Sequence, residues 1–275
     1  MRKTIVITGA SDGIGAAAAR RLHHDGHEVV VVGRSSAKTQ RVAEAIGADH
    51  LIADFADLDA VRALAATLTE RYPRIDVLAN NAGGVFGPRR TTANGFEKTF
   101  QVNHLAPFLL TTLLLPTLLA SRATVVQTAS IAARLYGKVD LADLDNARRF
   151  SANKAYGDSK LENILFTAEL HRRYGAAGLR AAAFHPGLIR SGFAAETTSF
   201  SMRMLYANPL TTRLLRTAED GADQLVWLAE TDAADAWQSG AYYEKRAIAT
   251  RMNPQANDAR LARELWEASA ALCSA

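Results

Sequence analysis

Cysteine is nearly absent from this sequence, which excludes two common ways of stabilising a fold. The 275 residues include a single cysteine, Cys273, so no intrachain disulfide can form and no cysteine-based metal cage is possible. Histidines and carboxylates do not cluster in the sequence either, so we expect no metal site. The lack of disulfides fits a reducing compartment best, and we expect the chain to be cytoplasmic.

Long apolar runs are also absent. The early apolar run Ile5–Ile7 is far too short for the apolar region of a signal peptide. The most apolar later stretch, Phe108–Ala120, is interrupted by three threonines and Pro116, and it falls short of the roughly 20 residues that span a bilayer. We therefore expect no membrane anchor.

The composition lacks low-complexity tracts, repeats and a one-sided charge. Hydrophobic residues make up 48% and charged residues 22% of the chain, with a net charge of +4, which is typical of a globular protein. Charges near the C-terminus mix in sign, as in Arg263 and Glu264, and indicate solvated helix faces rather than a nucleic-acid surface. The length of 275 residues predicts one domain over 1–275.

The sequence does contain an alternation of short β-branched runs with longer segments of helical period, which indicates βαβ units. We predict strands over Thr4–Thr8, Glu28–Val32, His50–Ala53, Val77–Asn80, Thr124–Thr128 and Leu179–Phe184. We predict helices over Ile14–Asp25, Ala37–Ile46, Leu58–Tyr72, Gly95–Leu119 (kinked or broken at Pro107 and Pro116) and Ala155–Tyr174. This order predicts an α/β, single-domain Rossmann fold, in which a doubly wound parallel sheet carries helices on both faces.

Three further segments do not follow this alternation. Tyr136–Asn153 is polar and is interpreted as a surface insertion. Residues 187–213 follow a strand end, where doubly wound sheets bind their ligands, and are interpreted as a substrate lid. The amphipathic segment 257–272 is predicted to be a C-terminal helix that either joins a subunit interface or covers the pocket.

A glycine-rich turn follows the first predicted strand. It reads Thr8-Gly9-Ala10-Ser11-Asp12-Gly13-Ile14-Gly15 and leads into an alanine-rich helix. Glycines permit a tight turn and let backbone N–H groups approach a pyrophosphate, which a helix N-terminus favours. A plain strand-to-helix connection is the alternative, but the position at the first βα turn favours phosphate binding.

The second predicted strand ends in a base, at the place where NAD-binding enzymes carry an acid. Arg34 follows Gly33 there, and no aspartate or glutamate stands nearby in the sequence. Together with Ser11 and Ser35, Arg34 could clamp the 2′-phosphate of NADP through charge-assisted hydrogen bonds. We therefore predict NADP(H) as the cofactor in preference to NAD(H), the alternative being a loop arginine without a ligand.

Tyr156 and Lys160 lie four residues apart, and so on one face of a predicted helix. A lysine beside a phenol lowers the pKa of that phenol, because the positive charge stabilises the phenolate. Such a pair alone is common on protein surfaces, so its meaning depends on the motifs that accompany it.

Together these motifs resemble the short-chain dehydrogenase/reductase family, over the chain from Thr4 to about Tyr243. The matching features are the turn Thr8–Gly15, Asp54, the run Asn80-Asn81-Ala82-Gly83, Asn103, Ser130, Tyr156 with Lys160, and the pair Pro186-Gly187. The residues around Asn103 and Lys160 most resemble the retinol-dehydrogenase-like and protochlorophyllide-reductase-like branch.

The resemblance implies an oxidoreductase that moves a hydride between a nicotinamide and a ketone, aldehyde or secondary alcohol, and it favours a ketoreductase. Tyr156 would be the acid/base, and Ser130 would hydrogen-bond the same substrate oxygen. Lys160 would bind the nicotinamide ribose and tune Tyr156. Asn103 would shape its helix and hold a water on the proton path to Lys160.

The resemblance also implies which residues bind the cofactor. These are Gly9, Ser11, Asp12, Gly13, Ile14, Gly15, Arg34, Ser35, Asp54, Phe55, Asn81, Ala82, Gly83, Tyr156, Lys160, Pro186, Gly187, Ile189 and Ser191. Asp54 would accept a hydrogen bond from the adenine, and the Pro186-Gly187 turn would frame the carboxamide.

The substrate contacts are predicted from strand ends and from the lid. The candidates are Phe86, Arg134, Tyr136 and Phe193, with Phe200 and Met204 as further lid residues. This mixed aromatic and arginine wall predicts a fairly large, apolar or aromatic ketone. His104 and His185 are interpreted as packed or hydrogen-bonded rather than catalytic, and Asp158 and Glu162 are expected to be solvated.

Two other functions stay open. A pseudoenzyme that senses NADP(H) would not need Asn103, Ser130, Tyr156 and Lys160 together, whereas an epimerase or dehydratase on the same fold is excluded only by turnover. The resemblance further implies a homodimer or homotetramer. Its subunits would be joined through exposed apolar faces of the helices predicted over Gly95–Leu119 and Ala155–Tyr174. We expect a small-molecule substrate that carries a carbonyl or alcohol group, and neither a nucleic-acid nor a membrane partner.

Overall fold

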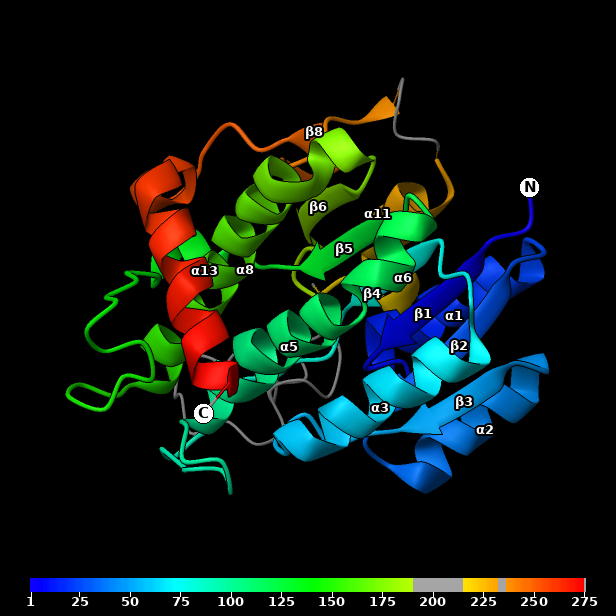
Figure 1. The fold of residues 1–275 in the computed structure, drawn as a ribbon, viewed down its shortest axis with the longest axis horizontal. Helices are drawn as coiled ribbons and strands as arrows, with labels where there is room; N and C mark the ends of the chain where they lie inside the picture. The colour runs from blue at the N-terminus through cyan, green and yellow to red at the C-terminus, as the bar shows by residue number, and fades with distance from the viewer. Residues whose placement is uncertain (190–214, 232–235, 275) are drawn as a thin grey trace.

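One eight-stranded sheet forms the centre of the molecule (Figure 1). The computed structural model describes residues 1–189, 215–231 and 236–274. The strand order is β3-β2-β1-β4-β5-β6-β7-β8, with every neighbouring pair parallel except β7 and β8. The strands are β1 (Thr4–Thr8), β2 (Glu28–Gly33), β3 (Asp49–Ile52), β4 (Val77–Asn80), β5 (Thr124–Thr128), β6 (Arg180–His185), β7 (Tyr242–Glu244) and β8 (Ala247–Ile248).

Helices cover both faces of this sheet (Figure 1). One face carries α1 (Gly13–His24), α2 (Ser36–Ile46) and α11 (Ala218–Glu230). The other face carries α3 (Leu58–Arg71), α4 (Lys98–Phe100), a π-helical turn (Gln101–Leu105), α5 (Ala106–Leu113), α6 (Leu115–Ala120), α8 (Ala152–Tyr174) and α13 (Ala259–Ser274). Shorter connections are α7 (Ala132–Leu135) and the 3-10 turns Gly175–Ala177 and Pro254–Asn257. Within the described ranges, no helix is long and apolar enough to cross a bilayer.

The central strands are apolar on both sides because both sides are covered. In β1, Ile5 and Ile7 pack into the core under α1 and α11, whereas Val6 packs into the core under α3, α5 and α8. All three side chains are fully buried. A parallel sheet that is covered on both faces produces such continuous apolar runs.

The predicted fold class is confirmed, and the six predicted strands agree with the structure to within one residue at each end. The predicted helix at Gly95–Leu119 is broken as expected, but it begins only at Lys98, because Gly95 turns with φ +88° and Glu97 caps the helix. The break before Pro107 is the π-helical turn. The strands β7 and β8 and the helix α11 were not predicted.

The C-terminal helix covers the face of α8 that was expected to be exposed. Trp266 of α13 stacks on Phe166 of α8, with ring centroids 5.5 Å apart, and meets Phe108 of α5 edge-on at 5.0 Å. Arg173 of α8 lies over the Trp266 ring at 4.6 Å. The prediction of an exposed apolar face on Ala155–Tyr174 is therefore wrong, since the chain's own C-terminal helix occupies it.

Candidate active site

A cavity of about 790 Å³ opens at the carboxyl ends of the parallel strands. Its walls are built by residues that directly follow β1, β2, β3, β4, β5 and β6. They include Gly9, Ser11, Asp12, Gly13, Ile14, Arg34, Ser35, Asp54, Phe55, Asn81, Ala82, Gly83, Ser130, Tyr156, Lys160, Pro186, Gly187 and Ile189. This is the edge at which doubly wound sheets bind ligands, and the volume lies in the range of small-molecule sites.

The glycine-rich turn packs so closely on neighbouring backbone that side chains at Gly9 and Gly15 would clash with it. Gly9 and Gly13 have φ of +64° and +54°, in the left-handed region that favours glycine. A Cβ on Gly9 would lie 2.7 Å from the Ala82 Cα atom, and one on Gly15 would lie 2.4 Å from the Gly9 carbonyl oxygen. Gly15 itself is buried and does not line the cavity. The turn ends at the N-terminus of α1, so the cradle fits a pyrophosphate group.

Asn81 braces the strand ends beneath this turn. Its Nδ2 atom donates to the backbone oxygens of Thr8 at 3.0 Å and Gly9 at 3.3 Å, while its Oδ1 atom accepts from the Thr128 hydroxyl at 3.3 Å. The Thr8 hydroxyl in turn accepts from the backbone N–H groups of Asn81 and Ala82, both at 3.0 Å. These bonds hold the ends of β1, β4 and β5 in fixed positions.

The end of β2 brings two basic side chains to the cavity wall. Arg34 and Lys38 are both exposed and both line the cavity, next to Ser35. The Lys38 Nζ atom lies 3.5 Å from the Asp12 Oδ2 atom. Lys38 was not predicted. It lies in the first turn of α2, whereas Arg34 precedes that helix.

Asp54 and Phe55 follow β3 at the same edge. The Asp54 Oδ1 atom accepts from the backbone N–H of Ala56 at 2.9 Å, while the carboxylate stays exposed at the cavity. Phe55 is 5% exposed and packs into the core. The exposed carboxylate can accept a hydrogen bond from a bound ligand.

Tyr156 and Lys160 lie on α8 and line the cavity together. The Lys160 Nζ atom donates to the Thr128 carbonyl oxygen at 2.8 Å and lies 5.7 Å from the centre of the Tyr156 ring. Burial lowers the pKa of Lys160 to about 8. Since this pKa is above neutrality, the side chain is mainly an ammonium ion at neutral pH, and its charge lies beside the phenol.

Asn103 does not line the cavity but supports it from behind. It lies in the π-helical turn, where its Oδ1 atom accepts from the Gly84 N–H at 2.9 Å, and its Nδ2 atom donates to the Gly84 oxygen and the Ser159 hydroxyl, both at 3.0 Å. A Cβ on Gly83 would lie 2.9 Å from the Asn103 Oδ1 atom and 3.3 Å from the Lys160 Nζ atom. Asn103 and Lys160 therefore meet at Gly83.

Ser130 follows β5 and lines the cavity, where its hydroxyl accepts from the Ala132 N–H at 3.2 Å. His185 supports this turn, since its Nδ1 atom accepts from the N–H groups of Ile131 and Gly187, both at 3.4 Å. Burial, with a smaller effect of Arg134, lowers the pKa of His185 to about 4. His185 thus remains neutral and structural, as predicted.

His104 is also a packed histidine. It is 1% exposed, stacks on Phe100 and hydrogen-bonds the Ser269 hydroxyl at 2.9 Å. Burial lowers its pKa to about 4. It connects the π-helical turn to α13 as a neutral ring.

The predicted substrate residues divide into three groups. Phe86 and Tyr136 line the cavity, whereas Arg134 points to the Arg251 carbonyl oxygen at 3.2 Å and does not line it. Phe193, Phe200 and Met204, and most of the proposed lid, lie outside the described residues, as does Ser191, which was predicted to bind the cofactor. Sequence reasoning missed several apolar wall residues, namely Val102, Ile131, Ala132, Leu135 and Leu188. Their only signal was their position after strand ends or next to motif residues.

The expectation that Asp158 and Glu162 are solvated is wrong. They are 3% and 1% exposed. Asp158 is held by hydrogen bonds from its neighbours, but no described residue donates a hydrogen bond to either oxygen of Glu162. Both residues point away from the cavity, toward the segment between α7 and α8 and the helix α4. No group of histidines, cysteines and carboxylates that could hold a metal ion occurs among the described residues.

Comparison with known proteins agrees with this geometry. The profile of the short chain dehydrogenase family matches residues 3–201. A Streptomyces sp. (strain C5) protein named "Putative daunorubicin C-13 ketoreductase DnrU" is 44% identical over 98% of this chain and 92% of its own length. Human retinol dehydrogenase 13 is 36% identical over 98% of this chain and 84% of its own length.

A solved structure from Mycobacterium paratuberculosis resembles the whole fold. It superposes with a TM-score of 0.78 at 34% identity and covers 99% of this chain and 93% of its own. Family members use nicotinamide cofactors, and the cradle at Gly9 fits such a group. The chain belongs to the short-chain dehydrogenase/reductase family, in the branch of the retinol dehydrogenases, and is a nicotinamide-dependent oxidoreductase.

Proposed function

We propose that the chain is an NADP(H)-dependent ketoreductase whose substrate is a large, neutral, mainly apolar ketone. One observation carries the proposal. Tyr156, Lys160 and Ser130 line the same cavity as the glycine-rich turn from Gly9 to Ile14. The glycine-rich turn would hold the cofactor, which is the reductant, and Tyr156 and Ser130 would hold the carbonyl group. The carbonyl group would therefore meet a proton donor and a reductant in one site.

The proposed chemistry divides the proton and the hydride between two partners. When bound, the nicotinamide supplies the hydride that the carbonyl carbon receives. Tyr156 gives its phenolic proton to the carbonyl oxygen, while the Ser130 hydroxyl donates a hydrogen bond to the same oxygen and orients it. The Lys160 ammonium beside the ring stabilises the phenolate that remains. The product is a secondary alcohol, and Tyr156 then regains a proton from solvent.

The NADP preference rests on the charges at the end of β2. Arg34 and Lys38 line the cavity there together with Ser35. The stretch from Gly33 to Lys38 contains no carboxylate that would repel a 2′-phosphate. An arginine fork and a lysine point charge both form charge-assisted hydrogen bonds with phosphate oxygens. We assign the 2′-phosphate to this pair.

The substrate class follows from the other end of the cavity. Apart from the catalytic groups, the described walls there are apolar, and Leu135, Tyr136 and Leu188 are large side chains left partly exposed at the cavity. Lining of this kind binds ring systems or chains through apolar contact. The names of the two relatives, which refer to daunorubicin and retinol, point the same way.

The test of the cofactor assignment is fluorescence titration with NADPH and NADH, applied to the wild type and to Arg34→Ala and Lys38→Ala. Each variant loses a charge-assisted contact with the 2′-phosphate, so the Kd for NADPH should rise about tenfold or more, which corresponds to about 1.4 kcal/mol. The Kd for NADH should stay within about twofold. Arg41→Ala is the control, since Arg41 is exposed on α2, the helix of Lys38, but does not line the cavity.

A panel of ketones and aldehydes, followed by NADPH absorbance, completes the test. Turnover of large apolar ketones in preference to small charged ones supports the proposal. NADPH binding without turnover of any carbonyl would favour an NADP(H) sensor instead. Equal loss of NADH affinity in the Arg34 and Lys38 variants would refute the assignment of the phosphate site.

A further inference from the structure

Two glycines bring a wall of the cavity into direct contact with the catalytic helix. A Cβ on Gly157 would lie 2.7 Å from the backbone nitrogen of Gly137 and 2.7 Å from the Tyr136 Cβ atom. A Cβ on Gly137 would lie 2.9 Å from the Gly157 carbonyl oxygen. No side chain fits between the two backbones, so Tyr136 of the cavity wall sits directly on the helix residue that follows Tyr156.

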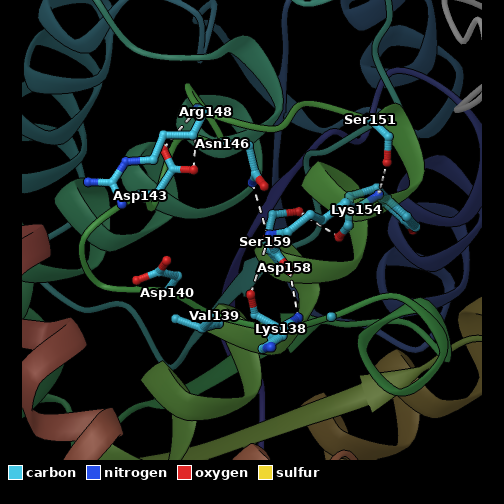
Figure 2. A network of polar contacts seen from close by, with 12 residues as sticks. Lys138, Val139, Asp140, Asp143, Asn146, Arg148, Ser151, Lys154, Asp158 and Ser159 are labelled. Atoms are coloured by element: carbon cyan, nitrogen blue, oxygen red, sulfur yellow. Dashed lines mark hydrogen bonds and ion pairs between the residues drawn. The ribbon is translucent and has the colours of Figure 1, made fainter.

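Asp158, the next residue of the helix, ties this segment down. Its Oδ1 atom accepts from the backbone N–H of Lys138 at 2.7 Å, and its Oδ2 atom accepts from the Asn146 side chain at 3.0 Å and also contacts the Lys154 ammonium. Figure 2 shows Lys138 and Asn146, from the segment between α7 and α8, and Lys154 of α8 converging on Asp158. A buried carboxylate with charge-assisted hydrogen bonds is a strong anchor.

The same segment is held from its other side by the stretch before α13. The Asn253 Nδ2 atom donates to the carbonyl oxygens of Ala133 and Gly137, both at 2.8 Å. The Gln255 side chain makes two hydrogen bonds to the backbone of Val139, at 2.9 Å and 3.0 Å. The backbone around Tyr136 is therefore fixed on two sides. Two side chains of the Tyr156 helix bond to it at Lys138, where Asp158 accepts from the N–H at 2.7 Å and the Lys154 ammonium donates to the carbonyl oxygen at 3.4 Å.

We propose that Asp158 is a positioning residue that sets the width of the substrate cavity, by holding the Tyr136 wall at a fixed distance from Tyr156. This inference rests on the proposed ketoreductase function. Tyr156 and Asp158 belong to the same helix, so the proton donor and the wall move as one body. A bulky ketone depends on that wall for its orientation, whereas a small ketone that does not reach Tyr136 does not.

The experiment compares Asp158→Ala with Asp158→Asn. Alanine leaves the Lys138 N–H without its acceptor and leaves the Lys154 ammonium with only the Lys138 carbonyl oxygen. Asparagine keeps an acceptor for Lys138, and its amide can donate to the Asn146 Oδ1 atom, which no described residue contacts with a hydrogen bond. Asp158→Ala should raise KM for a bulky ketone about tenfold, while KM for a small ketone and the Kd for NADPH stay within about twofold. Asp158→Asn should restore most of the bulky-ketone KM.

Two further variants provide a second test of the Asp158 contacts and a negative control. Asn146→Gly keeps the left-handed backbone at residue 146, where φ is +55°, and removes only its contact with Asp158. Asn146→Gly should raise KM for the bulky ketone by part of the amount expected for Asp158→Ala. It therefore tests the proposal even where Asp158→Ala does not fold. Asp140→Ala, at an exposed residue of the same segment, should leave the KM of both ketones unchanged.

Hydrogen exchange provides a readout that does not need turnover. The Lys138 amide should exchange at least about tenfold faster in Asp158→Ala than in the wild type, and nearly normally in Asp158→Asn. If the wild type reduces no ketone, the proposed function fails, and exchange alone then decides whether Asp158 holds the wall. If the wild type turns over and Asp158→Ala changes neither the bulky-ketone KM nor the Lys138 exchange, the inference is overturned.

Discussion

Several buried polar residues lie in or beside the candidate site, and their environments set what each can do. Lys160 keeps a charge because its pKa of about 8 is above neutrality, and it lies beside Tyr156. His185, with a pKa of about 4, is neutral and serves as a hydrogen-bond acceptor. The sequence could place Tyr156 and Lys160 on one helix face, but it could not show which neighbouring polar residues are buried.

Glu162 illustrates this limit and leads to a prediction about stability. Burial is the main cause that raises its pKa well above the usual 4.5, and Asp158 adds to the effect. The folded state therefore holds a proton that the unfolded chain releases above about pH 4.5, so this residue's contribution to stability is lost as the pH rises through that range. The loss amounts to about 1.4 kcal/mol per pH unit until the folded-state pKa is reached.

Glu162→Gln should remove this dependence, because a neutral amide replaces the protonated acid. Urea unfolding at about pH 5 and about pH 8 should show the variant gaining at least about 1 kcal/mol relative to the wild type at the higher pH. Glu70→Gln, at an exposed residue of α3, serves as the control and should show no such gain. A pH-independent difference between Glu162→Gln and the wild type would contradict the assignment of a protonated Glu162.

At the scale of elements, the sequence predicted the parallel strands well, because short apolar runs bounded by glycines and helical segments have few alternative structures. It missed β7 and β8, which are three and two residues long. It also missed α11, although Thr217 and Asp220 form a capping box that could have identified its start. The pairing of α13 with α8 could not be read from the sequence at all, since an amphipathic helix does not specify its partner.

This pairing changes the expected assembly. The α8 face that carries Phe166 is covered by Trp266 of α13. We therefore predict that size exclusion with light scattering finds a monomer of 29.6 kDa at micromolar concentration. A dimer that persists on dilution, with α8 protected from hydrogen exchange only in the dimer, would contradict the prediction.

At the scale of the whole molecule, the cavity exists because six parallel strands end at one edge of the sheet. The sequence motifs after those strands were recognisable one by one, and most of the residues predicted from them line one cavity. The substrate end was less predictable, because its apolar walls carry no motif. Arg134 was predicted to line the cavity only because it follows a strand end. Its side chain donates to the Arg251 backbone instead of lining the cavity.

In the proposed reaction Tyr156 supplies the proton for carbonyl reduction with NADPH. Its most direct test is the kcat of Tyr156→Phe on a ketone that the wild type reduces, measured together with the Kd for NADPH. Tyr156→Phe should lose about 100-fold or more in kcat, because a general acid contributes about that much, with the Kd for NADPH nearly unchanged. Turnover by Tyr156→Phe at close to the wild-type rate would contradict it.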